Sequence, residues 1–227
     1  MQKMRAIAKH HTNFLISIFC SVQSSLIFIT YLSFGTFAKD VTVDPIKSSS
    51  IYREAYKKIE LRDYRSAIRL FDSLLVKTSL SAEAFYGRAK AKQELGDNKG
   101  ALEDYSSSIK LDKANPKAYS NRGLVYGALG EFKKAIADFD QAIKLNPSFE
   151  YAYSNRGVAK GALSDTKGAI ADFKKATELN PKYAAAWRNS GIMKEIIGDI
   201  MGACQDWKKA SDLGQKDVTE WLNKQCR

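Results

Sequence analysis

A period of 34 residues recurs five times in this chain without a slip in register, and it constrains the fold more than any other feature. Five columns of residues follow this spacing. They are a small residue (Ala55, Ala89, Gly123, Gly157, Gly191), an alanine (Ala67, Ala101, Ala135, Ala169, Ala203), an aromatic (Phe71, Tyr105, Phe139, Phe173, Trp207), a mostly small residue (Leu74, Ser108, Ala142, Ala176, Ala210) and a large apolar residue (Ile51, Phe85, Tyr119, Tyr153, Trp187, Trp221). Self-similarity at one fixed period is the signature of an architecture in which each unit packs only against its neighbours.

The third unit, residues 116–149, predicts two helices joined by a short turn. Pro116 suits the first helical position, because its missing amide would have no partner there. A helical pattern then runs to Leu129, and Gly130 supplies the left-handed residue that ends a helix. A second helical pattern follows over 132–145. The unit is therefore predicted to be a helical hairpin.

Small residues in facing columns let the two helices of a unit approach closely. Gly123 and Ala135 are such a pair, and the aromatic residues Tyr119 and Phe139 fill the space around them. A single unit cannot bury its apolar face alone. The units are therefore expected to stack and to share one continuous core.

The 34-residue period and these columns resemble the tetratricopeptide repeat. The resemblance implies an all-α fold, a right-handed superhelical solenoid of helix-turn-helix repeats with a concave groove, and a protein that binds partners. The frame places repeats 1 to 5 at 48–81, 82–115, 116–149, 150–183 and 184–217, and a C-terminal capping helix at 218–227. Repeat 1 is degenerate, since Arg62 replaces its turn glycine, and Ser164 predicts a strained or altered turn in repeat 4.

Residues 1–38 lie outside the repeats and predict export. Three basic residues come first, and 10–38 contain no Asp, Glu, Lys or Arg. Small residues at 36 and 38 suit cleavage before Lys39, which is typical of a secretory signal peptide. The alternative is an uncleaved membrane anchor, because 14–34 is long enough to span a bilayer at ~20 residues. In both cases the repeats follow a polar linker (39–47) and lie in an extracytoplasmic compartment, the periplasm or a lumen.

Only two cysteines, Cys204 and Cys226, follow this segment. They flank the turn at 213–214 and come level in an antiparallel hairpin, so in an exported chain they predict a disulfide between the cap and repeat 5. The alternatives are a small core residue with an idle thiol, or a thiol redox pair. The closing segment GACQDWKKASDLG…EWLNKQC also resembles the C-terminal end of repeat proteins from cyanobacteria.

The first helices carry the candidate partner-binding groove, as the resemblance implies. An asparagine recurs at the 34-residue spacing, and its amide can pair with both polar groups of an extended peptide backbone. The predicted groove residues are Asn121, Asn155, Asn189, Arg122, Arg156, Arg188, Lys90, Tyr86 and Tyr151. Their basic and aromatic character suits an acidic or C-terminal peptide, although Leu124 and Ala185 replace two residues of the carboxylate clamp of some family members. The alternative is that the asparagines are simply solvated.

Lysines on the second helices contribute to the net charge of +11. Their pairs at 133–134, 174–175 and 208–209 predict a solvated outer face, or alternatively a face attracted to an anionic membrane or an acidic partner. Carboxylates on the same helices are expected to pair with lysines four residues away along the helix. These are Asp138, Asp140, Asp172 and Asp206.

The sequence predicts no enzyme, no cofactor and no metal site. Both histidines, His10 and His11, lie in the export segment, and no phosphate-binding loop or metal-spaced cysteine pair follows. Nucleic acid is not an expected partner of an exported array. The predicted function is a protein–protein scaffold or adaptor, such as an assembly factor. The alternative is a membrane-surface or self-associating scaffold that acts through the basic face.

Overall fold

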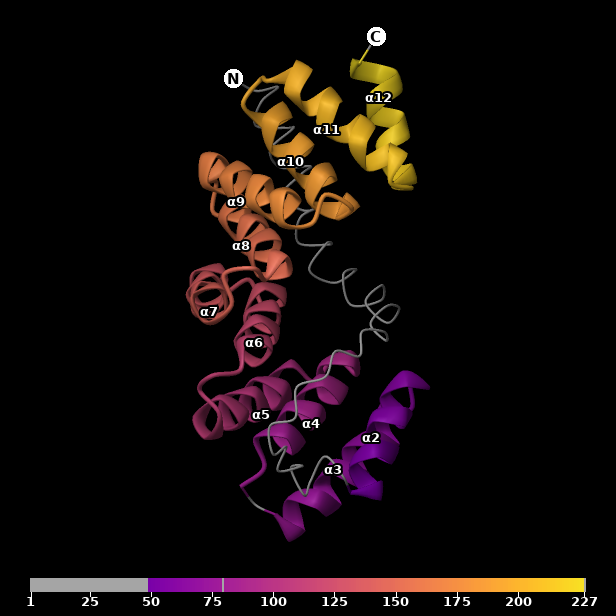
Figure 1. Ribbon diagram of the computed structural model, residues 1–227, viewed down its shortest axis with the longest axis vertical. Coiled ribbons are helices and arrows are strands. Elements are labelled where there is room, and N and C mark those ends of the chain that lie inside the picture. Colours follow the sequence, from indigo (N-terminus) through magenta and orange to yellow (C-terminus); the bar gives the residue numbers. More distant parts are fainter. Residues whose placement is uncertain (1–48, 79, 227) are drawn as a thin grey trace, which may run out of the picture. The chain divides into compact units, whose positions relative to one another are not determined.

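The computed structural model describes residues 49–78 and 80–226, and within them the chain is all-α (Figure 1). Its helices are α2 (Ser50–Glu60), α3 (Tyr64–Lys77), α4 (Ala82–Glu94), α5 (Asn98–Leu111), α6 (Pro116–Ala128), α7 (Phe132–Leu145), α8 (Glu150–Ala162), α9 (Thr166–Leu179), α10 (Ala184–Ile196), α11 (Ile200–Asp212), the 3-10 helix η2 (Lys216–Val218) and α12 (Thr219–Gln225). The predicted signal peptide or anchor (1–38) and the linker (39–47) lie outside the described residues.

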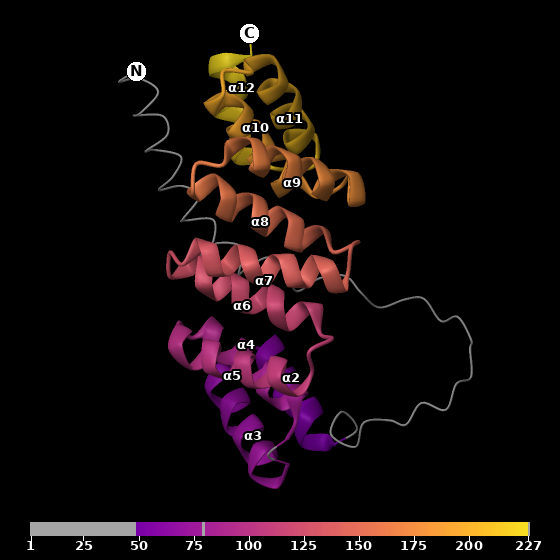
Figure 2. The same cartoon turned by 90° about the vertical axis from the view of Figure 1, so that its left-hand side faces the viewer.

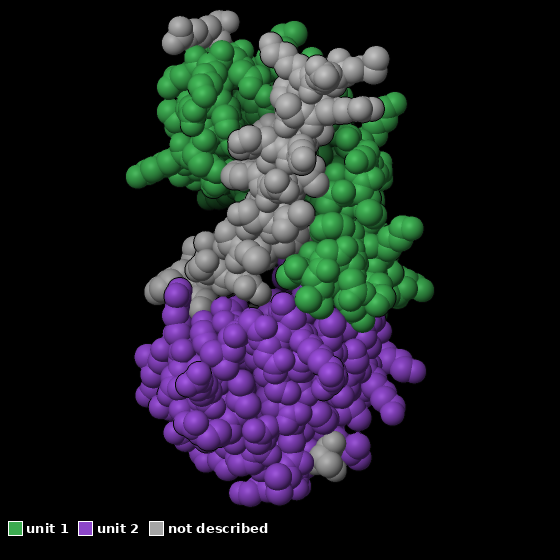
Figure 3. Space-filling model, turned by 180° about the vertical axis from the view of Figure 1, so that it is seen from behind, with its two compact units in different colours: residues 1–20, 126–227 green, residues 21–125 purple. Residues whose placement is uncertain are grey.

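The chain divides into two compact units (Figure 3). The boundary between residues 125 and 126 falls within α6. The described part of unit 2 is 49–78 and 80–125, and that of unit 1 is 126–226. In unit 2 each helix from α2 to α5 packs against the next, and unit 1 repeats this from α7 to α12. Figure 2 shows α8, α9, α10 and α11 in this order along unit 1. The all-α stack of helical hairpins predicted from the period is confirmed.

The recurring columns form the cores of both units. The aromatic column is fully buried, at 0% exposure for Phe71, Tyr105, Phe139, Phe173 and Trp207. The alanine column shares this burial. The small column in unit 1 faces these aromatics so closely that a Cβ on its two glycines would lie within 3 Å of the Phe173 and Trp207 rings. Close helix packing therefore explains why this column holds only small residues.

The turn inside each hairpin keeps one backbone conformation, whichever residue occupies it. Gly96, Gly130 and Gly198 have positive φ angles, as expected for a residue that ends a helix. Arg62 (φ 57°) and Ser164 (φ 65°) adopt the same left-handed conformation without being glycine. The turn of repeat 4 is thus not altered in shape but holds a residue type that this conformation disfavours.

An aspartate begins the second helix of four repeats. Its carboxylate accepts a hydrogen bond from the backbone amide three residues on, which satisfies one of the free amides at the helix start. These N-cap residues are Asp63, Asp97, Asp165 and Asp199. The turn residue and the aspartate together explain why the register of the helices is kept from repeat to repeat.

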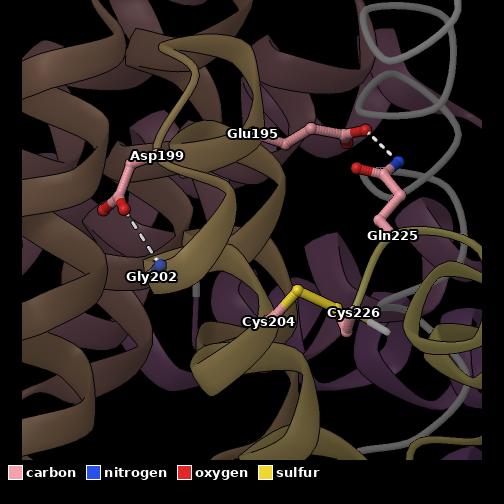
Figure 4. The surroundings of a disulfide bond; sticks show 6 residues. All are labelled: Glu195, Asp199, Gly202, Cys204, Gln225 and Cys226. Carbon is pink, nitrogen blue, oxygen red and sulfur yellow. Dashed lines mark hydrogen bonds between the residues drawn. A yellow bond between two sulfur atoms is a disulfide. The ribbon is translucent and has the colours of Figure 1, made fainter.

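The C-terminal helix α12 covers the end of unit 1. Trp221 packs against Trp207 with ring centroids 5.2 Å apart, and both belong to the cluster around Ala203 and Ala210. The Sγ atoms of Cys204 and Cys226 lie at bonding distance, 1.96 Å, and Gln225 donates a hydrogen bond to Glu195 (Figure 4). The structure therefore brings together the two cysteines that the hairpin geometry predicts to be level.

Candidate functional site

Two predicted groove residues of unit 2 meet across 35 positions of the sequence. Asn121 on α6 donates a hydrogen bond from Nδ2 to the Tyr86 hydroxyl on α4, over 2.9 Å. The Tyr86 ring also packs edge-on against buried Tyr105 at 5.8 Å. Desolvation by burial raises the pKa of Tyr86 to about 12, so its hydroxyl stays neutral at pH 7. Both side chains are half-buried, and each is held in one orientation by the other.

Two further tyrosines extend this surface onto α2. The Tyr52 and Tyr56 rings pack at a tilt of 46° with centroids 4.8 Å apart, and Tyr56 packs edge-on against Phe71 at 5.6 Å. The α2 and α4 helices are in contact, and both tyrosines pack against a core cluster that includes Ala84 and Ala91 of α4. The sequence prediction missed this pair. The signal was present, because the two tyrosines precede Tyr86 and Lys90 by one 34-residue period.

The corresponding asparagines of unit 1 lie in a different environment. Asn155 on α8 and Asn189 on α10 are buried, at 7% and 2% exposure. Asn189 accepts a hydrogen bond from the neighbouring Arg188 guanidinium over 3.2 Å. The third predicted residue of this unit, Tyr151, is half-buried and packs against Phe149 and Tyr183. The asparagines at this spacing therefore do not share one degree of exposure.

The predicted arginines form ion pairs and hydrogen bonds inside the fold. Arg156 binds both carboxylate oxygens of Asp172, at 2.9 and 2.6 Å, and also contacts Asp140 at 2.5 Å. Arg122 donates to the Ser106 hydroxyl over 3.1 Å, and Arg188 binds Asp217. Arg88, one period before Arg122, repeats the pattern with Asp104 and Asp72. These guanidinium groups therefore contribute to packing between helices.

The pairing predicted for the second-helix carboxylates is wrong for three of the four. Asp172 binds Arg156 and Lys160, which precede it by 16 and 12 residues on the helix before. Asp206 binds Lys194 in the same way, and Asp140 binds Arg156 on α8. Asp172 and Asp206 are buried between the two helices of their own hairpin, whereas Asp140 is half exposed and pairs with the first helix of the next repeat. Spacing along one helix cannot reveal such a partner.

Unit 1 also contains a pocket of about 330 Å³ between α9, α10 and α11. Residues with different chemistry line it: Ile170, Lys174, Thr177, Glu178, Trp187, Ser190, Lys194 and Asp206. None of the predicted groove residues lines this pocket. Within the described residues, no group of three or more His, Cys, Asp or Glu side chains could hold a metal ion, and no helix is both long and apolar enough to cross a bilayer.

Comparison with known families gives the identity of the repeat. Residues 116–149 and 150–183 each match a family model described as "Tetratricopeptide repeat", and residues 89–130 match one described as "TPR repeat". The chain contains tetratricopeptide repeats. A search of curated proteins found no match. The resemblance of the closing segment to cyanobacterial repeat proteins stays a prediction.

Solved structures share the tetratricopeptide fold at low sequence identity. MamA is 24% identical, with a TM-score of 0.66 over 72% of this chain and 96% of its own. YrrB, titled "a TPR protein with an unusual peptide-binding site", is 21% identical, with a TM-score of 0.64 over 77% and 90%. PilW, titled a "widely conserved type IV pilus biogenesis factor", is 22% identical, with a TM-score of 0.66 over 72% and 76%. These similarities establish the fold of this chain.

Proposed function

We propose that this protein is a non-catalytic scaffold that holds an extended segment of a partner polypeptide against the first helices of its repeats. The observation that carries the proposal is the cluster formed by Tyr52, Tyr56, Tyr86 and Asn121 in unit 2. The peptide-binding site named for YrrB, a protein of the same fold, supports it by analogy.

The chemistry of this cluster suits a peptide backbone. The Asn121 amide offers one acceptor and two donors, and one donor is already used to fix its orientation on Tyr86. Tyrosine rings supply a large contact area with few rotatable bonds, so little conformational entropy is lost when a partner binds. Lys90 lies four residues after Tyr86 and adds a positive charge, which favours an acidic segment.

The arginines are expected to contribute less to partner binding than their charges suggest. Arg88 and Arg156 are each neutralised by two aspartates, and an acidic partner would have to displace these internal ion pairs. We therefore place the main contacts on the tyrosines and on Asn121, and treat an acidic partner as a preference set by Lys90.

Site-specific crosslinking in the native cells tests the proposal. A photoreactive phenylalanine at Tyr56 or Lys90 should crosslink a partner, whereas the same group at exposed Lys110 on α5 should not. Adding Asn121→Ala should lower the yield at position 90 about tenfold, because the amide proposed to bind the partner backbone is lost and Tyr86 is no longer held in place. Equal crosslinking from positions 90 and 110 would count against a site on the first helices.

We also propose that the chain works outside the cytoplasm, on the strength of the apolar segment at 10–38 and the two remaining cysteines. Intact mass of the protein from its own cells, with and without reductant and alkylation, tests this. Export with cleavage predicts a chain that starts at Lys39 and is two hydrogens lighter before reduction. A soluble full-length chain with free thiols would overturn it.

A second candidate function is attachment to an anionic surface, or self-association, through the second helices. Six lysines on α7, α9 and α11 are exposed: Lys133, Lys134, Lys174, Lys175, Lys208 and Lys209. Binding to vesicles with anionic lipid should then fall steeply between about 50 and 500 mM salt, because salt screens the attraction between exposed charges. Crosslinking at position 90 would be insensitive to changing these lysines to glutamine, which separates the two functions.

A further inference from the structure

Repeats 2 and 4 each contain an arginine that is held in the same way. Arg88 donates from Nε and Nη2 to the two oxygens of Asp104, at 2.8 and 2.6 Å, and lies over the Phe85 ring at 5.5 Å. Arg156 donates to Asp172 with the same atoms and lies over the Tyr153 ring at 5.4 Å. A carboxylate and an aromatic face thus form a site for one guanidinium group, which is a pairing that suits arginine.

Repeat 5 keeps this site but lacks the arginine. One period after Arg156 the chain has Ser190, while the aromatic and the acid persist as Trp187 and Asp206. The volume that the arginine would fill lies open as the 330 Å³ pocket, which Ser190, Trp187 and Asp206 all line. The Trp187 ring is fixed by a hydrogen bond from its Nε1 to the Pro181 carbonyl, over 3.0 Å.

Asp206, at the base of the pocket, has one carboxylate oxygen that can accept a hydrogen bond from a ligand. Asp206 is 4% exposed, and both the Ser190 hydroxyl and the Lys194 ammonium donate to its Oδ2, each over 2.6 Å. Its Oδ1 receives neither bond. In repeats 2 and 4 the equivalent Oδ1 atoms accept from arginine Nη2. The pocket therefore presents the acceptor that a guanidinium uses elsewhere in the same protein.

A second carboxylate lies on the pocket wall. Arg156 has Asp140 as its second acid, and the residue one period after Asp140 is Lys174. The pocket instead includes Glu178, one turn further along α9. The Glu178 carboxylate lies 4.0 Å from the Lys174 ammonium, and both side chains are more than half exposed. Solvent therefore weakens this ion pair, and Lys174 can move aside when a ligand binds.

We propose that this pocket binds the side chain of an arginine from a partner polypeptide. The guanidinium stacks on Trp187 and donates to Asp206 Oδ1. An anion is disfavoured because it would face a buried carboxylate. A lysine reaches the same carboxylate but has neither the planar face nor the fork of donors. The site is independent of the tyrosine cluster of unit 2, so either proposal can fail without the other.

Titration of the purified protein with N-acetyl-arginine amide tests the proposal. The signal is the indole N–H of Trp187 in a spectrum of protein with labelled tryptophan, assigned with Trp187→Phe. We expect a saturable shift at millimolar ligand. N-acetyl-citrulline amide, the uncharged isostere, should bind about tenfold more weakly, because a charged hydrogen bond is stronger than a neutral one. Equal binding of the two amides would overturn the proposal.

Free arginine distinguishes a polypeptide partner from a small-molecule ligand. If free arginine binds about tenfold more tightly than the capped amide, its own carboxylate or ammonium takes part, and the assignment to a polypeptide side chain is wrong. We expect the capped amide, which lacks those charges, to bind at least as well.

Variants at the position of the missing arginine complete the test. Ser190→Arg should fill the pocket with an internal guanidinium and weaken ligand binding about tenfold or more, because the acceptor is then occupied. Ser190→Ala is the matched control, since it removes the same hydroxyl but leaves the pocket open, and it should bind the ligand clearly more tightly than Ser190→Arg. Wild-type affinity in folded Ser190→Arg would overturn the proposal. If that variant fails to fold, the comparison of arginine and citrulline amides still decides it.

Discussion

Repeats 4 and 5 are built on the same frame, and each departs from it where the other does not. Repeat 4 keeps the interhelical arginine, Arg156, but has Ser164 at the left-handed turn position. Repeat 5 keeps the turn glycine, Gly198, but has Ser190 in place of the arginine. Both repeats keep the same buried alanine and aromatic positions. The columns that fill the core are therefore fixed, while the turn and the ion pair tolerate change.

The two repeats also differ in the segment that follows each of them in the chain and packs against it. Repeat 4 is succeeded by a full hairpin, whereas repeat 5 ends against η2 and the seven-residue helix α12. A helix this short has little stability of its own. Together with η2 it is held by Trp221, which packs at a tilt on Trp207, by the ion pair of Arg188 with Asp217 of η2, and by Cys226, whose Sγ lies at bonding distance from that of Cys204. The segment that covers repeat 5 is therefore held by its contacts with that repeat rather than by its own helical stability.

Removal of the link between the cysteines should have the largest effect. Cys226→Ser opens a loop closed over a separation of 22 residues, which corresponds to a loss of ~3 kcal/mol in the chain-entropy model. Hydrogen exchange should become faster in α12 and in the first turns of α11 around Cys204, with α8 unchanged. Reductant should reproduce the effect in wild type and add nothing in the variant. Identical exchange in reduced and oxidised wild type would mean that the pair is not bonded.

Arg156→Ser should have the second-largest effect on stability. It gives repeat 4 the residue that repeat 5 has at the same position, Ser190. Asp172, at 4% exposure, would keep Lys160 but lose both bonds from the guanidinium. We expect the free energy of unfolding to fall by about 2 kcal/mol, because a buried carboxylate is left only partly satisfied.

Urea denaturation measures this change, and Arg156→Lys is its control. A lysine keeps the positive charge but cannot bind both carboxylate oxygens, so about half of the loss should remain. An unchanged midpoint in Arg156→Ser would show that the ion pairs of this column do not stabilise the hairpin, and the difference between repeats 4 and 5 would then be neutral.

Gly157→Ala and Gly191→Ala should differ in their effect on stability, and this difference should be smaller than the losses described above. A Cβ at Gly191 would lie 2.4 Å from Trp207 Nε1, whereas one at Gly157 would lie 2.9 Å from Phe173 Cε1. Gly191→Ala should therefore destabilise the protein by about 1–2 kcal/mol through overpacking. In Gly157→Ala the gain in helix propensity, about 1 kcal/mol, should roughly offset the strain. Thermal unfolding of both variants measures the difference, and equal costs would contradict the closer fit of repeat 5.

Sequence reasoning predicted the features that recur and missed those that depend on a neighbouring helix. The period, the small columns and the turn positions are readable because the backbone demands them at every repeat. The cysteines were paired by counting residues from a turn, which is also a local measure. The partners of Asp172 and Asp206 lie 12 and 16 residues away on the preceding helix, so the expected spacing of four was wrong.

The candidate site was predicted less completely than the fold, for a related reason. Asn121 and Tyr86 were both identified, but their hydrogen bond joins positions 35 residues apart and is visible only in the structure. Tyr52 and Tyr56 were not predicted, although they precede Tyr86 and Lys90 by one period. The pocket of repeat 5 was not predicted, since it arises from the volume that a missing side chain leaves between three helices.

Exchange of the turn residues between the two repeats should have the smallest effect, and its sign is opposite in the two directions. Ser164 has a φ of 65°, a conformation that costs a residue with a Cβ ~1 kcal/mol relative to glycine. Ser164→Gly should therefore raise the free energy of unfolding by up to about 1 kcal/mol, reduced by the larger chain entropy of glycine when unfolded. Gly198→Ser should lower it by a similar amount, since Gly198 has a φ of 84° and nothing crowds its Cβ position. Chemical denaturation of both variants provides the measurement. If both variants lose stability, then Ser164 makes a contact that offsets its backbone strain, and the two turns are not equivalent.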